Sequence, residues 1–253
     1  EHYEILQQIE ERNTKYDNSS LFTVFKFLDW NVMLFVLLFF VLLLWTTISD
    51  ERSPTSTIIF LVTKPIRFQS IYCTKWAYNL IISYSLLLIS GGLIFFIATL
   101  IGGLGEAQYP ILIYATDRIE EHFFFSNANN AYFYFESLAA LLVKSGILII
   151  AQIFFLNSLF SFIGKLMKNH YAVIVVTCIV VMTGYSFGNY YIDMASSVYN
   201  PFIYFDTWNI VDGWKSIEAS NRNVNFLSGI IILFISGSLL FCLGLLSKRK
   251  VSR

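Results

Sequence analysis

Three polar side chains lie within one otherwise apolar run of this sequence, where they could contact a polar molecule inside a bundle of helices. The run is Ser137–Ile163, and Lys144 is its only charged residue. A charge in such a run is costly unless it faces protein, water or a partner, or reaches the polar boundary. Gln152 follows eight residues later on roughly the same helical face, and Asn157 lies nearer the far end. We expect these three residues to line a substrate path or subunit interface; the alternative is that Lys144 snorkels or forms a structural ion pair.

Other chemistry finds little support in the residue patterns. No GxxxxGK[ST] motif occurs, so the chain itself has no predicted phosphate-binding loop. The histidines are too far apart for the spacing of a metal site: His2, His122 and His170. The Glu120-Glu121 pair resembles the paired acids of some intramembrane proteases, but Phe125 stands where such a site needs a basic residue. We therefore predict no catalytic, cofactor or metal site, and an intramembrane protease is the disfavoured alternative.

The elements that must position these side chains are membrane-spanning helices. Hydrophobic residues make up 56% of the chain and charged residues only 13%, against about 25% charged in soluble domains. Five apolar runs approach or exceed the roughly 18 residues that mark a spanning helix: Trp30–Ile48, Ala77–Ile101, Ser137–Ile163, Tyr171–Phe187 and Phe226–Ser247. The sequence therefore predicts an all-α polytopic membrane protein with five visible spans.

The basic residues indicate which side of the membrane each connection occupies. Segments 49–76, 164–170 and 248–253 hold ten Lys and Arg against two acids. Segments 1–29, 102–136 and 188–225 hold six Lys and Arg and the other fifteen acids. Short loops rich in Lys and Arg stay on the cytoplasmic side. We predict a multi-pass protein of a cell membrane, expected to be bacterial, with the visible N-terminus outside and the C-terminus in the cytoplasm.

Two of the predicted outer segments are dense in aromatic residues. They are His122–Glu136 and Asn189–Trp214. Phe, Tyr and Trp collect at membrane–water boundaries, so an aromatic belt explains both segments. The alternative is that the segments fold back into the outer leaflet and cap an exit, which requires surrounding protein or a water-filled cavity.

The first predicted inner loop, 49–76, contains a short amphipathic helix. Ser53-Pro54 is a typical helix start, and Pro65 disfavours helical geometry in the residue before it. The predicted helix, Ser53–Lys64, is short and rich in β-branched residues, so by itself it would be marginally stable. We expect it to dock on a partner surface through its apolar residues: Ile58, Ile59, Leu61 and Val62.

This loop resembles the permeases of ABC-2 type ABC transporters. The residues that carry the resemblance are Glu51, Arg52, Ser56, Thr57, Phe60, Leu61, Val62, Pro65, Ile66, Arg67 and Lys75. It continues through the basic turn Lys165–His170 and through Asn200-Pro201-Phe202 with Tyr204-Phe205. The resemblance implies that residues 30–253 form an ABC-2 transmembrane domain, that 1–29 end an outer domain, and that a sixth span precedes Glu1.

The resemblance also implies a function and partners. In that family the short inner helix is a coupling helix that seats in a groove of a separate ABC ATPase, which binds ATP and Mg²⁺. The implied ATPase-coupling residues are Glu51, Arg52, Ser56, Thr57, Phe60, Leu61, Lys64 and Arg67. We expect a non-enzymatic permease subunit that pairs with itself or a paralogue and exports amphipathic or hydrophobic cargo. A peptide toxin or antimicrobial peptide is the preferred cargo, a lipid-like molecule is an alternative, and no nucleic-acid partner is expected. The rival hypothesis is a membrane sensor or immunity protein that binds an outer peptide without moving it.

Overall fold

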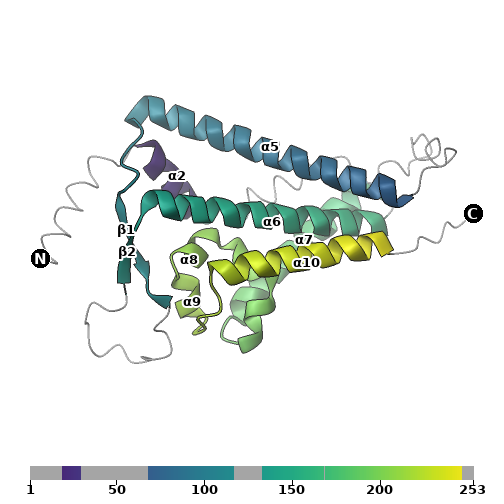
Figure 1. The fold of residues 1–253 in the computed structure, drawn as a ribbon. Helices are drawn as coiled ribbons and strands as arrows, with labels where there is room; N and C mark the ends of the chain where they lie inside the picture. The colour runs from purple at the N-terminus through teal and green to yellow at the C-terminus, as the bar shows by residue number, and fades with distance from the viewer. Residues whose placement is uncertain (1–18, 30–67, 117–132, 168, 247–253) are drawn as a thin grey trace, which may run out of the picture.

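The computed structural model describes residues 19–29, 68–116, 133–167 and 169–246, and its framework is a set of long helices (Figure 1). These are α5 (Phe68–Gly102), α6 (Leu138–Leu166), α7 (His170–Tyr190) and α10 (Phe226–Leu246). Each is long and apolar enough to cross a membrane. The prediction of a mainly helical membrane protein is therefore confirmed for four spans. The remaining predicted span, 30–48, and the predicted coupling helix lie outside the described residues.

The largest difference in the bounds of the spans is at the start of α5. The sequence places this start at Ala77, whereas the helix begins nine residues earlier at Phe68. The early turns carry Lys75 and several polar residues, so their hydropathy is too low to mark a span. At 35 residues, α5 is about 52 Å long at 1.5 Å per residue. It therefore exceeds the roughly 30 Å hydrocarbon layer, and must tilt or project beyond it.

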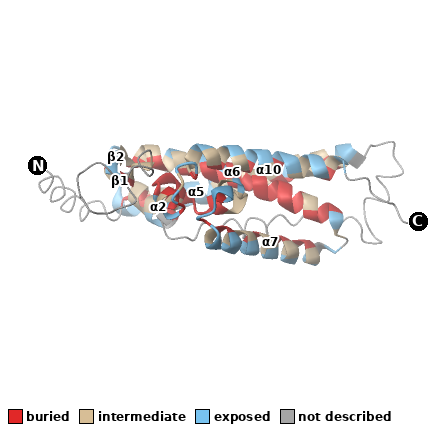
Figure 2. Ribbon diagram, turned by 90° about the horizontal axis from the view of Figure 1, so that it is seen from below, coloured by how far each residue is buried: buried red, intermediate tan, exposed pale blue. Residues whose placement is uncertain are grey.

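Helix α6 is the centre of the bundle. Half of its most apolar stretch is buried, whereas only 6% of the corresponding stretch of α5 is buried. In Figure 2 the buried positions concentrate around α6, and α7 turns an exposed side outward. Glycines let α10 approach α6 closely, since a Cβ on Gly237 would lie 2.8 Å from the Phe154 ring. Close packing around small residues is a common basis of helix association in membranes.

We call the end of the bundle where α5 ends and α6 begins the outer end, following the charge distribution. A two-stranded antiparallel ribbon lies there, formed by β1 (Pro110–Tyr114) and β2 (Phe133–Ser137). Its register pairs Pro110 with Ser137 and Tyr114 with Phe133. The sequence prediction did not include this ribbon, because the aromatic residues of β2 were interpreted as a boundary belt. Aromatic and β-branched side chains also favour strands, and here the two segments supply each other's backbone partners.

Helix α2 (Ser20–Asp29) fits between the outer ends of α5 and α6 (Figure 1). The Ser20 amide donates to the carbonyl of Gly103 at 3.0 Å. The Phe25 ring meets the Trp208 ring edge-on, with centroids 4.7 Å apart. Thus the last part of the predicted outer segment 1–29 is integrated into the outer end of the bundle.

The connection between α7 and α10 folds into four short helices, and we call residues 191–225 the outer cap. They are the 3-10 helices η3 (Ala195–Tyr199) and η4 (Pro201–Phe205) and the helices α8 (Thr207–Val211) and α9 (Trp214–Glu218). Helix η4 packs against both α7 and α10, and α8 packs against α6. Ile203, Tyr204 and Phe205 are almost completely buried, so the cap contributes to the core of the bundle.

Candidate functional site

Lys144, the single charge predicted within a span, forms an ion pair with the ribbon. Its Nζ lies 2.6 Å from the Glu136 Oε1 on β2. The two side chains keep 34% and 19% of their exposure. The charge is thus neutralised within the chain, close to the outer end of α6. This ion pair is of the kind named among the alternatives for Lys144, and a role in a substrate path or subunit interface stays a prediction.

Gln152 anchors the outer cap to the middle of α6. Its side chain is completely buried, and its Nε2 donates to the Tyr204 carbonyl at 2.5 Å and to the Thr207 Oγ1 at 2.9 Å. The residue lies fourteen positions after Leu138, which is about 21 Å along the helix. The cap therefore reaches about half-way down α6. The partners of the buried Gln152 amide are supplied by cap residues Tyr204 and Thr207.

The aromatic residues of this connection divide between the two interpretations of the sequence. Tyr190 and Tyr199 are exposed, as a boundary belt would require. Tyr204 is buried beside Gly229 of α10, and its hydroxyl donates to the Val198 carbonyl at 2.8 Å. Burial raises the pKa of the Tyr204 phenol, so this group stays a protonated donor. The buried part of the segment therefore resembles a re-entrant element surrounded by protein.

A buried ionic cluster stabilises the cap, and it was missed from the sequence. The Lys215 Nζ lies 3.5 Å from the Asp206 Oδ2 and 2.7 Å from the Glu218 Oε2. The side chains of Lys215 and Asp206 are only 5% and 6% exposed. The Asn209 Nδ2 donates to both Asp206 oxygens, at 2.9 Å and 2.8 Å. Such partners offset the cost of burying the charges. The only sequence signal was the presence of opposite charges in an otherwise aromatic segment.

Asn157 joins α6 to the inner part of α5. Its Nδ2 donates to the Trp76 carbonyl at 3.0 Å, and the Trp76 Nε1 donates to the Ser158 Oγ at 3.2 Å. The Trp76 ring also packs on Phe241 of α10, with centroids 4.5 Å apart. One tryptophan thus contacts both α6 and α10.

A second contact lies nearer the inner end, about one turn before Trp76 on α5 and about two turns after Asn157 on α6. The Lys165 Nζ donates to the Gly244 carbonyl of α10 and lies 5.6 Å from the centroid of the Tyr72 ring. Tyr72 itself is buried against Gly244. We call these residues, with Trp76 and Asn157, the inner clamp: Tyr72, Trp76, Asn157, Lys165 and Gly244. The clamp holds α5, α6 and α10 together near the start of α5, shortly after the last predicted ATPase-coupling residue, Arg67.

The predicted site residues are therefore not gathered in one place. Lys144 contacts the ribbon, Gln152 the cap, and Asn157 the inner clamp. The predicted ATPase-coupling residues lie outside the described residues: Glu51, Arg52, Ser56, Thr57, Phe60, Leu61, Lys64 and Arg67. The described chain resumes at Phe68, directly after Arg67, as the first residue of α5.

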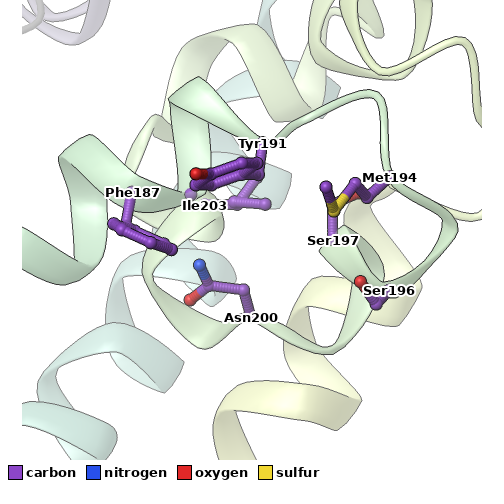
Figure 3. A pocket seen from close by; sticks show the side chains of 8 residues that line it. Phe187, Tyr191, Met194, Ser196, Ser197, Asn200 and Ile203 are labelled. Atoms are coloured by element: carbon purple, nitrogen blue, oxygen red, sulfur yellow. The ribbon is translucent and has the colours of Figure 1, made fainter.

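Two cavities flank η3 at the rim of the outer cap. The smaller, about 350 Å³, lies between the end of α7 and η3 (Figure 3). The larger, about 620 Å³, lies between η3 and the outer half of α10. Lys144, Gln152 and Asn157 line neither of them. Both cavities thus lie beside the cap, away from the polar contacts of α6.

Within the described residues, no group of three or more His, Cys, Asp and Glu side chains could hold a metal ion. The side chains of Gln152, Asn157 and Lys165 each join α6 to another element of the bundle. No protein-family model, curated protein or solved structure matches the chain. The geometry of the clamp, the cap and the cavities is therefore the basis for a functional proposal.

Proposed function

We propose that this chain is the permease subunit of an ABC exporter of the ABC-2 type, which moves amphipathic or hydrophobic cargo, most simply peptides. The observation that supports this most is the inner clamp at the start of α5. The last predicted ATPase-coupling residue, Arg67, directly precedes Phe68, the first residue of α5. Two turns into α5, Trp76 contacts both α6 and α10. A load applied to the loop would therefore be shared by three spans.

The same helices connect the clamp with the outer cap. Asn157 of the clamp and Gln152 of the cap anchor lie five residues apart on α6. Gly244 and Gly229 lie at opposite ends of α10, one at the clamp and the other beside Tyr204. A rigid helix with partners at both ends is a physical route for coupling between two sites. In this proposal ATP-driven closure of the ATPases displaces the loop, the helices tilt, and the cap opens the outer side.

The cargo path in this proposal lies between two permease subunits. Lys144, Gln152 and Asn157, the polar residues predicted to line a path along α6, each contact another element of the same chain. Helix α5 offers a long apolar surface, on which Leu88, Phe96 and Leu100 are exposed. Such a surface suits a second subunit and amphipathic cargo. The permease contributes shape and a binding surface, and the partner ATPase supplies ATP hydrolysis.

The proposal is tested by purifying the protein from membranes of its native source. A Thr57→Arg/Leu61→Arg variant adds two charges to the face of the predicted coupling helix that would enter the ATPase groove. A matched control, Asn127→Arg/Asn129→Arg, adds the same charge to the predicted outer segment 102–136, on the other side of the membrane from the ATPase. We expect an ABC ATPase to co-purify with the wild type and the control and to be lost from the first variant. If no ATPase accompanies the wild type, the proposal fails and the peptide-sensor hypothesis replaces it.

The role of the clamp requires a second measurement. Asn157→Leu removes the hydrogen bond to the Trp76 carbonyl without touching the predicted coupling helix. In the wild-type complex we expect ATP to change the hydrogen exchange of residues 201–211. We expect the variant to retain the ATPase and to lose this ATP-dependent change. An unchanged response in the variant would mean that the clamp does not transmit the movement.

A further inference from the structure

The smaller cavity combines an aromatic wall with polar atoms. Phe187, near the end of α7, and Tyr191, directly after it, pack with ring centroids 4.7 Å apart and ring planes tilted by 46°. Figure 3 shows these rings and Ile203 on one side of an open space, with Met194 and Ser197 on the other. No charged side chain is among its lining residues. The cavity therefore favours an uncharged ligand with an apolar part.

One polar atom of this lining is buried without a partner. Ser197 is 6% exposed, and its Oγ has no hydrogen-bond partner in the part of the chain that the structure describes. An unsatisfied buried hydroxyl is costly, and native proteins carry few of them. A ligand that hydrogen-bonds to this hydroxyl would remove the cost. Ser197 thus indicates where a polar atom of the ligand would lie.

A second hydrogen-bonding group is held in place across the cavity. The Asn200 Oδ1 accepts from the Phe202 amide at 3.0 Å, which leaves the Nδ2 as the donor end of the side chain. Gly188 makes room for this amide, because a Cβ there would lie 2.8 Å from the Nδ2. Figure 3 shows the nitrogen on the side of Phe187 and Tyr191. The cavity therefore offers a hydroxyl and an amide donor beside an aromatic wall.

We propose that this cavity binds one uncharged aromatic or aliphatic residue of a peptide. This inference rests on the proposed function, since the peptide is the exporter's cargo on the outer side. The apolar side chain lies against Phe187, Tyr191 and Met194. The peptide backbone donates its N–H to the Ser197 Oγ and accepts from the Asn200 Nδ2. A volume of about 350 Å³ is near the lower end of the roughly 300–1,000 Å³ of ligand pockets, which suits one residue and its backbone.

The lining disfavours the other ligand classes. A hydrocarbon tail would leave the Ser197 hydroxyl and the Asn200 amide unsatisfied, which costs free energy in a buried site. A charged group would meet no opposite charge in the lining. Met194 is unbranched and adapts to different shapes, so the site can accept several apolar side chains. A peptide residue fits both the polar and the apolar halves.

The binding test uses the purified chain in nanodiscs and the methyl signals of its four methionines. The Met194 signal is assigned with a Met194→Leu variant, and Met182 on α7 serves as the internal control. The probe is N-acetyl-phenylalaninamide. With about 15 non-hydrogen atoms at about 0.3 kcal/mol each, its Kd is on the order of 1 mM. We expect a saturable shift of the Met194 signal and no saturable shift of the Met182 signal.

Two further probes and two variants define the site. N-acetyl-lysinamide tests charge, n-hexane tests a bare alkyl chain, and both are expected to leave Met194 unshifted. Ser197→Ala should weaken binding about 2- to 10-fold, the contribution of one hydrogen bond, while leaving thermal stability unchanged or higher because its Oγ has no partner to lose. Ser186→Ala, an exposed position outside the lining, should change neither quantity.

The outcomes separate this site from the transporter proposal. No saturable shift of Met194 with the phenylalanine probe overturns the site. An equal shift with n-hexane that is insensitive to Ser197→Ala also overturns it, in favour of a non-specific apolar cavity. The titration needs no ATPase. If the probe binds but no ATPase co-purifies, the peptide site stands and the transporter proposal fails. If an ATPase co-purifies but the probe does not bind, the transporter proposal stands and the peptide site fails.

Discussion

The anchor between α6 and the outer cap is the contact whose removal has the most definite expected cost. Gln152→Leu replaces the buried amide with an apolar side chain of similar size. The Tyr204 carbonyl then loses the bond it accepts from Gln152, and the Thr207 hydroxyl loses its contact with the same side chain. Both residues are almost completely buried, so water cannot easily replace the lost amide.

The magnitude follows from the cost of leaving buried polar groups unsatisfied. Each such group costs about 1–3 kcal/mol, so the two together cost about 2–6 kcal/mol. A chain of this size loses roughly 2–4 °C of Tm per kcal/mol, which predicts a decrease of roughly 4 °C or more. Thr207→Val added to Gln152→Leu should recover part of the loss, because one orphaned group is removed. The coupling energy of the double-mutant cycle should fall within about 0.5–3 kcal/mol.

The assay is thermal unfolding in nanodiscs combined with hydrogen exchange of the cap. We expect faster exchange in residues 201–211 of the Gln152→Leu variant, since this stretch loses its attachment to α6. Ser145→Ala is the matched control on the same helix, because Ser145 is completely buried and its Oγ has no partner among the described residues. That control should leave Tm unchanged or raise it. A Gln152→Leu variant as stable as the control, with unchanged exchange in the cap, would refute the reasoning.

Three further substitutions test the packing and the ion pairs by their effect on Tm. Gly237→Ala should lower the free energy of unfolding by about 1–3 kcal/mol, because the added Cβ would overlap the Phe154 ring of α6. Gly146→Ala, with open space around it, should leave this free energy unchanged or raise it by up to about 1 kcal/mol. Equal effects of the two substitutions would contradict this packing. Lys215→Met should cost about 3–5 kcal/mol by leaving Asp206 buried and uncompensated, and a cost below about 1 kcal/mol would show that the cluster is solvated. Lys144→Met should cost at most about 1 kcal/mol, since its ion pair is partly exposed, and a larger loss would indicate an additional role for this lysine.

The interior contacts also bear on where cargo could pass. Gln152 and Asn157 each hydrogen-bond to another element of the same chain, and Lys144 forms an ion pair with β2. A path along α6 within one subunit would have to break these bonds, each at a cost comparable with the net value of a buried hydrogen bond. The proposed path between subunits avoids that cost. It also leaves the cavity beside Ser197 accessible at the rim of the cap.

The sequence by itself determined the spans that the structure describes. An uninterrupted apolar run in a bilayer must satisfy its backbone internally, and a helix is the simple way to do so. The predicted bounds of α6, α7 and α10 are accordingly within three residues of the observed ones. The start of α5 was missed because the turns before Ala77 are amphipathic, and their apolar residues face α6 and α10 within the inner clamp.

Only the tertiary structure decided which polar groups meet. Gln152 finds Thr207 at a separation of 55 residues, and Asn157 finds Trp76 at a separation of 81. Hydropathy and periodicity report how one segment meets its surroundings, and they carry no information on which distant segment supplies a partner. The cap between α7 and α10 and its buried Lys215–Asp206 pair arise in the same way. They exist because the chain folds back between spans, where every buried polar group requires a partner.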